Sequence, residues 1–365
     1  MISWDILKAS LDRIQKATDK KRVCVGFDGY VDTLYRVVRS RKSLQCFELF
    51  STIGEFADRV GKAAGRSADM ELQGVSRRMG GNAPLMAEAM GCLNVSARCI
   101  GTMGYPETED VFAADKVHFI PNSVAPCAGS MAFEFSDGKL MFGDTAPLLT
   151  LDWDRITTVL GLENLKAWYQ GCNAWAVVNW SFVLNCNDIL EGFLRDVVDG
   201  CDGGKILFFD LADPSGRSRE ELLRLFDLLG RLNRKNRVVL SMNENESLHV
   251  ASALDLSGET LLAEHRAEAI REKLRIYMAS VHALDYAVAA TAEQMVRADT
   301  VFHADPVIST GGGDHFNGGF CTALIHGLTP GDALAFGNLV SSCYVGGGHS
   351  PSLSQLADYI TKCSK

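Results

Sequence analysis

The chain has 365 residues, of which 47% are hydrophobic and 22% charged, so it can bury a large core in a single domain over residues 1–365. Its net charge of -9 argues against a nucleic-acid surface, although backbone N–H groups can still bind a phosphate locally. The 11 cysteines include no C-x-x-C pair, which favours reduced thiols over disulfides or zinc, and no apolar run is long enough for a membrane span. We therefore expect a cytoplasmic protein without membrane or nucleic-acid partners.

Short apolar runs alternate with helical patterns along most of the chain. The first run, "RVCVGF", begins at Arg22 and stops at the polar segment "DGYVD". Comparable runs begin near Val95, Ala174, Lys205, Arg237 and Asp285, with amphipathic stretches between them. Because these runs lack polar alternation, they predict buried parallel strands with helices on both faces. The predicted class is α/β, a three-layer α/β/α arrangement around a mainly parallel sheet.

Polar residues stand where several of the predicted strands end. They are Asp28, Asp32, Asn179, Asp210, Asp213, Asn243 and Glu246. In parallel sheets, ligands bind at the carboxyl ends of the strands. We therefore expect these side chains to line one crevice.

Two segments interrupt the alternation of strands and helices. Residues 69–81 and 129–144 have the pattern of antiparallel strands, and the second contains a Ser-Asp-Gly turn between two hydrophobic arms. We interpret them as parts of a small β-sheet lid over the crevice, formed by segments within about 33–79 and 103–145. The alternative is an edge hairpin without a functional role.

A glycine triplet precedes a carboxylate in the segment "ISTGGGDHFNGGF". Gly311, Gly312 and Gly313 lead into Asp314, at the start of a helical pattern. Unpaired N–H groups at a helix start can bind an anion that glycines allow to come close. Asp314 beside such an anion can act as a base that takes a proton from an attacking hydroxyl. The alternative is that Asp314 caps the helix and the glycines form a tight turn.

Two further motifs occur at characteristic places. "GGNAPLMAEAMGCL" places Gly80, Gly81 and Asn82 before a helix, and "SMNENE" places Asn243 and Glu246 after an apolar strand. Together with the glycine–aspartate segment, they make the chain resemble the ribokinase-like (PfkB-type) carbohydrate kinases. The three motifs occur in the family's order and at about its spacing, so the resemblance spans roughly residues 22–360.

The resemblance implies a role for the C-terminal motif. Asp314 matches the family's catalytic base. Gly311, Gly312 and Gly313 match its anion hole, where the family carries alanine at the position of Gly312.

The resemblance also implies a nucleotide site for ATP with Mg²⁺. Asn243 and Glu246 match an N-x-x-E motif that organises magnesium and its waters around the phosphates, so Glu246 would act on the metal through water. Thr310 and Thr291 are the further candidates for nucleotide or phosphate contacts. A bare N-x-x-E in a loop before a helix is, by itself, typical of a helix cap.

The N-terminal glycine motif implies a sugar site. Gly80, Gly81 and Asn82 match the family's substrate loop. Asp32 is the first candidate for the carboxylate that binds sugar hydroxyls, and Asp28 is the competing one, because "GFDGYVD" aligns with a one-residue ambiguity.

The chain departs from the family pattern at three places. Leu85 stands where the family has an asparagine that contacts the sugar, and Ile308 stands where the family has an aspartate associated with a monovalent cation. Around Thr291 the glycines of the family's T-x-G-x-x-G segment are missing. These departures put one sugar contact, potassium activation and the usual base and ribose contacts in doubt.

The sequence thus predicts a small-molecule kinase that transfers the terminal phosphoryl group of ATP to a hydroxyl of a sugar or sugar-like substrate. An ADP-dependent sugar kinase of the same fold and a catalytically impaired metabolite sensor are the alternatives. The resemblance also allows a homodimer formed through the lid.

Overall fold

The structure is a computed structural model that describes residues 2–256, 262–308 and 310–364. Its centre is a nine-stranded sheet in the order β14-β13-β12-β11-β10-β9-β1-β5-β6. The strands from β12 to β6 in this order run parallel, whereas β13 and β14 join the edge antiparallel. Their bounds are β1 Arg22–Gly26, β5 Ser96–Gly101, β6 Ile120–Ser123, β9 Ala174–Val177, β10 Ile206–Asp210, β11 Arg237–Asn243, β12 Met278–His282, β13 Tyr286–Ala290 and β14 Met295–Asp299.

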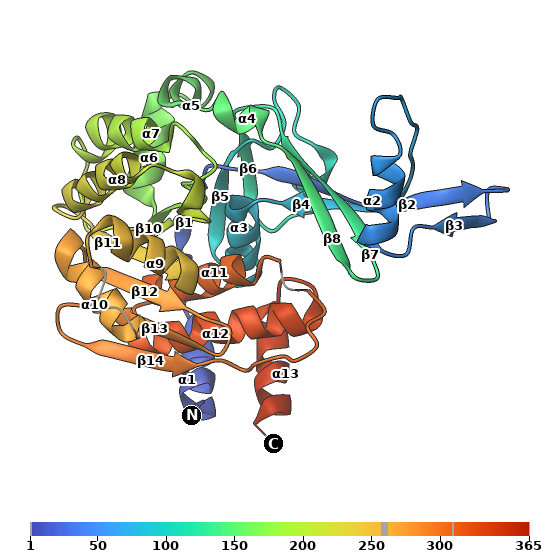
Figure 1. Cartoon of the computed structure of the whole chain (residues 1–365). Coiled ribbons are helices and arrows are strands. Elements are labelled where there is room, and N and C mark those ends of the chain that lie inside the picture. The colour runs from blue at the N-terminus through green and yellow to red at the C-terminus, as the bar shows by residue number, and fades with distance from the viewer. Residues whose placement is uncertain (1, 257–261, 309, 365) are drawn as a thin grey trace.

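Helices cover both faces of this sheet (Figure 1). One face carries α1 Trp4–Gln15, α3 Asn82–Cys92, α11 Gly312–Ile325, α12 Pro330–Gly347 and α13 Leu353–Cys363. The other carries α5 Trp153–Leu160, α6 Leu162–Gly171, α7 Cys186–Phe193, α8 Arg219–Leu232, α9 Glu244–Ala253 and α10 Ala263–Leu274. Shorter pieces are α4 Ala146–Leu149, the 3₁₀ turns Asp110–Phe112 and Pro214–Gly216, and the π-helical turn Leu194–Val198. The predicted α/β/α class is confirmed.

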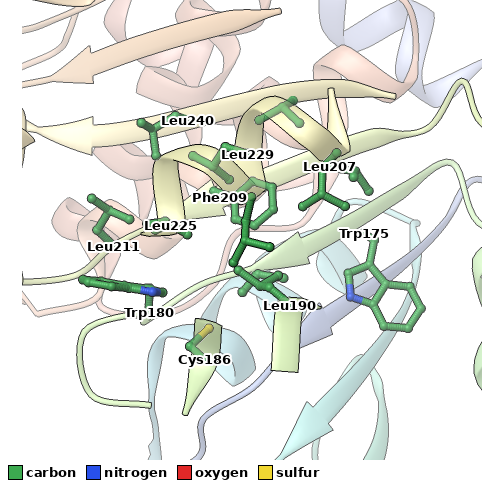
Figure 2. Packing of buried hydrophobic residues seen from close by; sticks show 14 of the residues in the cluster. Trp175, Trp180, Cys186, Leu190, Leu207, Phe209, Leu211, Leu225, Leu229 and Leu240 are labelled. Carbon is green, nitrogen blue, oxygen red and sulfur yellow. The ribbon is translucent and has the colours of Figure 1, made fainter. Parts of the chain in front are cut away.

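Side chains alternate between the two faces of each strand, and this alternation explains why there are two hydrophobic cores. On β9, Trp175 and Val177 belong to the core under α5–α10, whereas Ala174 and Ala176 belong to the core under α1, α3, α11 and α12. Successive strand side chains point to opposite faces, so a strand that is apolar throughout must be covered twice. Figure 2 shows part of the first core, where Phe209 and Leu240 of the sheet lie with Leu225 and Leu229 of α8.

A second, five-stranded sheet extends away from the first (Figure 1). It contains β2 Tyr30–Arg41, β3 Phe47–Leu49, β4 Glu71–Gly80, β7 Ala128–Phe135 and β8 Gly138–Asp144, with α2 Ile53–Gly61 against it. Strands were expected at residues 69–81 and 129–144, but the long β2 was not, because its first half is only partly buried and follows no clean alternation. Within the range 103–145, β6 joins the main sheet.

No helix among residues 2–256, 262–308 and 310–364 has the length and apolar character needed to cross a membrane.

The packing of α8 gives a matched stability test. Leu229 is fully buried in the core of Figure 2, whereas Leu223 on the same helix is 42% exposed. Leu229→Ala should lower the free energy of unfolding by about 2–5 kcal/mol, because it removes buried methyl groups and leaves a cavity. Leu223→Ala should cost less than about 1 kcal/mol. Denaturant unfolding of both variants measures the difference, and equal losses would contradict the packing described here.

Candidate active site

The carboxyl ends of neighbouring parallel strands bring polar groups to one edge of the main sheet. Asp28 follows β1, Asp210 ends β10, Asn243 ends β11 and His282 ends β12. At the same edge, the N-terminus of α3 is hydrogen-bonded to Asp28, and α11 is hydrogen-bonded to Asp210 through Asn317. The polar strand tips thus gather at this edge, but not in one crevice: Asn243 lines one cavity and Asp32 another, while Asp28, Asp210 and Glu246 are buried.

Asp28 joins three separate segments of the chain. It is fully buried, and its carboxylate accepts hydrogen bonds from the backbone N–H groups of Asn82 (2.9 Å) and Ala83 (2.7 Å), the first residues of α3. It also accepts one from Nδ2 of Asn179, 2.7 Å away, beyond the end of β9. Burial raises the pKa of Asp28, and these three hydrogen bonds oppose the rise. All three hydrogen bonds come from the protein itself, so the Asp28 carboxylate caps the N-terminus of α3.

Asp32 occupies a different environment on β2. It lies beside Gly80, where a Cβ atom would collide with the Asp32 carboxylate. Burial raises the pKa of Asp32, while the positive charges of Arg78 and Lys139 lower it. Asp32 lines a cavity of about 430 Å³ whose other walls include Arg78, Lys139 and Thr310. Of the two competing carboxylates, Asp32 is the one that faces a cavity.

Gly81 shapes the turn between Asp28 and α3. Its φ is +97°, and a Cβ atom there would lie 3.1 Å from Oδ2 of Asp28. A side chain would be both strained and crowded, so glycine allows the backbone of α3 to approach the carboxylate.

The glycine triplet forms the start of α11. Gly311 is the N-cap with φ +91°, and a Cβ atom there would lie 2.9 Å from Oη of Tyr344. Gly312 and Gly313 begin the helix and line a second cavity, of about 730 Å³. Its walls also include Asn243, Asn245, His282, Leu284, Phe302, Pro306 and Ser341. The unpaired N–H groups of a helix start thus face a cavity with polar and apolar walls.

Asp314 lies in the first turn of α11 and is 8% exposed. Its pKa is raised well above the ordinary value of 3.8, first by burial and then by the charges of Asp210 and Asp28. A hydrogen bond with the Asn82 side chain opposes the rise. A carboxyl group in such surroundings can bind and release a proton at higher pH than an exposed aspartate.

Asn243 and Glu246 form a reciprocal cap at the start of α9. Asn243 Oδ1 accepts the Glu246 backbone N–H at 2.9 Å, and Glu246 Oε2 accepts the Asn243 backbone N–H at 2.9 Å. Asn243 Nδ2 also donates to Oε1 of Glu246 at 2.6 Å. Glu246 is only 4% exposed. Burial, and then the charge of Asp210 ahead of those of Asp314 and Asp213, raise its pKa to about 9.

Asp210 ties this edge of the sheet to α11. Its Oδ2 accepts Nδ2 of Asn317 at 2.8 Å, and Oδ1 of Asn317 accepts the hydroxyl of Ser241 at 2.7 Å. All three residues are buried. The helix that carries Asp314 is therefore fixed against two strands of the sheet.

Two of the predicted nucleotide contacts lie elsewhere. Thr291 follows directly after β13, which runs antiparallel to β12. The last residue of β13, Ala290, pairs with Ala279 near the start of β12, so Thr291 lies at the opposite edge of the sheet from the site. There its hydroxyl accepts the backbone N–H groups of Glu293 and Gln294 in a turn. Thr310 lines the cavity of Asp32, not the cavity of Gly312 and Gly313.

Two histidines belong to the site although no spacing pattern indicated them. His282 lines the cavity of Gly313, and burial lowers its pKa to about 4. His315 is stacked on Tyr344 with ring centroids 3.5 Å apart, and its Nδ1 lies 2.7 Å from the Gly311 carbonyl oxygen. His315 thus supports the N-cap of α11. The end of an apolar strand is the sequence signal that would have indicated His282.

Comparison with known proteins agrees with this geometry. The sequence model of the prokaryotic ketohexokinase family matches residues 4–362. A ketohexokinase of Haloferax volcanii is 26% identical over 353 residues, which are 96% of this chain and 93% of that protein.

Solved structures with the same fold include a ribokinase of Thermotoga maritima (17% identity, TM-score 0.63, 94% of this chain and 100% of that chain). They also include a fructokinase with bound ATP from Xylella fastidiosa (17% identity, TM-score 0.63, 94% and 99%). A third is a putative ribokinase II of E. coli in complex with ATP and Mg²⁺ (16% identity, TM-score 0.62, 94% and 100%). At these identities the structures establish the fold alone. With the match over nearly its whole length, the chain belongs to the prokaryotic ketohexokinase family and is a carbohydrate kinase with the ribokinase fold.

Proposed function

We propose that the protein transfers the terminal phosphoryl group of ATP to a hydroxyl of a ketohexose. The observation that carries this proposal is the path of the chain between the two cavities. Ile308 and Thr310 line the cavity of Asp32, Gly312 and Gly313 line the second cavity, and Asp314 follows directly. A group bound in one cavity can thus meet a group bound in the other beside Asp314. The ketohexose is proposed from the names of the family and of its relative.

In this mechanism the sugar lies in the cavity of Asp32. The Asp32 carboxylate accepts hydrogen bonds from two neighbouring hydroxyls, and Asn82, in the first turn of α3, provides a polar side chain near Asp314. Leu85 lies beside Gly311, where a Cβ atom would be 3.2 Å from its Cδ1. Leu85 thus places an apolar side chain beside Gly311, where the resemblance predicts an amide.

Asp314 acts as the general base. It takes the proton of the attacking hydroxyl as the oxygen bonds to phosphorus, and ADP leaves with the electron pair of the broken P–O bond. The N–H groups at the start of α11 stabilise the negative charge on the transferred phosphoryl oxygens. His315 and Tyr344 keep Gly311 in the conformation that presents these groups.

The acidic groups fit a magnesium ion bound with the nucleotide. The charges of Asp210 and Asp314 raise the pKa of Glu246, and that of Asp210 raises the pKa of Asp314, so a nearby divalent cation would stabilise their charged forms, and carboxylate oxygens suit Mg²⁺. When bound, the ion supplies positive charge beside the phosphates. Glu246 would hold it through water, since both of its carboxylate oxygens already accept hydrogen bonds from Asn243.

We further propose that the five-stranded sheet closes over the sugar and excludes water. It carries Asp32, Arg78 and Lys139 to the cavity, so its position sets the shape of the sugar site. Pairing of this sheet with that of a second copy would give the homodimer, which sedimentation can test.

The donor and acceptor are tested by supplying ATP or ADP with Mg²⁺ and a panel of ketohexoses, aldohexoses, pentoses and nucleosides. Turnover with ATP and a ketohexose is expected. Turnover with ADP alone would favour the ADP-dependent alternative. Binding of a sugar without any turnover would favour the metabolite sensor.

Asp314→Asn tests the base. The variant should keep its affinity for sugar and ATP but lose at least about 100-fold in kcat, because general-base catalysis typically contributes 10²–10⁴. Steady-state kinetics and equilibrium binding measure the two effects. A variant that retains most of its turnover would remove Asp314 from the mechanism.

The pH dependence tests the acidic surroundings of Asp314. The base must be ionised, so kcat/KM should fall as the pH drops through its pKa, and this fall should begin well above the pH expected for an ordinary aspartate. Asp210→Asn removes a neighbouring negative charge and should move the acid limb to lower pH. Asp202→Asn, at an exposed position, is the matched control and should leave it in place. If the acid limb of the pH profile does not move in Asp210→Asn, a group other than Asp314 controls it.

Alanine substitutions test whether the glycines allow a phosphoryl group to approach the backbone or only allow the tight turn before α11. A Cβ atom at Gly313 meets only His282 Cε1 at 3.4 Å, so Gly313→Ala should keep its melting temperature but place a methyl group in the nucleotide cavity. We expect kcat to fall at least about 10-fold. Gly311→Ala, with φ +91° and Tyr344 against it, should instead lower the melting temperature. A fully active Gly313→Ala enzyme would mean that this glycine serves only the turn.

A further inference from the structure

A second group of chemically reactive side chains lies at the other end of α3 from the kinase site. Glu88 and Cys92 are one helical turn apart near the C-terminus of α3, and His118 lies in the loop before β6. One donor atom of each residue lies within 4.8 Å of the donor atoms of the other two. A carboxylate, a thiol and an imidazole form the ligand set that zinc commonly takes in proteins.

The hydrogen bonds of this group converge on a single oxygen. The His118 ring nitrogen Nδ1 lies 2.7 Å from Oε1 of Glu88, and the Cys92 thiol donates to the same oxygen at 3.8 Å. Because the three donor atoms lie this close together, small adjustments of the side chains would bring all of them to one cation.

The backbone holds this arrangement in position. Oε2 of Glu88 accepts the His118 backbone N–H at 2.7 Å, which orients the carboxylate and leaves Oε1 toward the other two groups. Gly91 lets the loop come this close, because a Cβ atom there would collide with the His118 carbonyl oxygen. A second contact that orients a ligand in this way is typical of metal sites.

The group is also accessible from solvent. The His118 side chain is 63% exposed, whereas that of Glu88 is 12% exposed. Gly91 and His118 lie at the wall of a surface cavity of about 620 Å³. An ion can reach the group from the exposed side of His118, and a water molecule can complete a tetrahedral shell.

We propose that Glu88, Cys92 and His118 bind one Zn²⁺ ion. The Cys92 thiolate, the Glu88 carboxylate and the neutral His118 ring give two negative charges, which balance those of the ion. The thiol proton passes to solvent when the Zn–S bond forms, and the His118 nitrogen bonds to zinc with its lone pair. The ion would link the C-terminal end of α3 to the loop before β6 and stabilise the fold.

The test uses the full-length protein, stripped of metal and then titrated with Zn²⁺ in competition with a chromophoric chelator. Excess Mg²⁺ is present to occupy the acidic groups of the kinase site. We expect one tightly bound equivalent and a rise in melting temperature. Cys92→Ser and His118→Asn should each weaken binding at least about 10-fold. Cys46→Ser and His349→Asn, at exposed positions away from the group, should not.

Replacement of zinc by Co²⁺ gives a readout that does not depend on the stability of any variant. A thiolate ligand produces a sulfur-to-cobalt charge-transfer band in the near ultraviolet, which the unaltered protein should show and Cys92→Ser should lack. The proposal is wrong if the protein binds no zinc, if it binds zinc equally well after both substitutions, or if the cobalt form shows no such band. In those cases Glu88 and His118 form only a surface ion pair.

Discussion

The architecture of the kinase site depends on how its buried carboxylates are hydrogen-bonded. Three of them have a side-chain amide as a hydrogen-bond partner: Asp28 with Asn179, Asp210 with Asn317, and Glu246 with Asn243. An amide N–H satisfies a buried oxygen without cancelling its charge. The site is therefore fully folded while its negative charge remains uncompensated by these partners. Burial is the first reason why the pKa values of these three groups and of Asp314 are raised, and neighbouring carboxylates add to the rise for Glu246 and Asp314.

The same contacts couple the start of α3 to the start of α11. Asp28 holds the first residues of α3, Asn82 extends from there to Asp314, and Asp210 holds α11 through Asn317. The glycines at the two helix starts allow each backbone to reach its carboxylate or its cavity. A shift of either helix would break a hydrogen bond to a buried charged group, which is costly. Asp314 is thereby kept at a fixed place in the first turn of α11.

Much of this could be predicted from local sequence. The apolar runs predicted the parallel strands, and the polar residues at their ends predicted that acidic and amide groups gather at one edge of the sheet. The anion site at the glycines before Asp314 stays a prediction. The amide partners could not be predicted, because Asn179 lies 151 residues from Asp28 and Asn317 lies 107 from Asp210. Thr291 was predicted as a nucleotide contact. The composition of β13 does not reveal that this strand runs antiparallel to β12 and carries Thr291 to the opposite edge of the sheet. The group of Glu88, Cys92 and His118 was missed because its ligands are three different residue types from a helix and a loop.

Asn243 and Glu246 show that a helix cap and a functional site need not be alternatives. The reciprocal cap explains why these residue types stand three positions apart, since each satisfies a backbone N–H of the other. If the cap were exposed, helix capping alone would explain both residues. Here the capping carboxylate is 4% exposed and its pKa is raised to about 9, so the chain keeps an acidic group where an uncharged glutamine would satisfy the same N–H group. The cap fixes the position of the carboxylate near Asp210 and Asp314, which is where the proposed role beside the phosphates needs it.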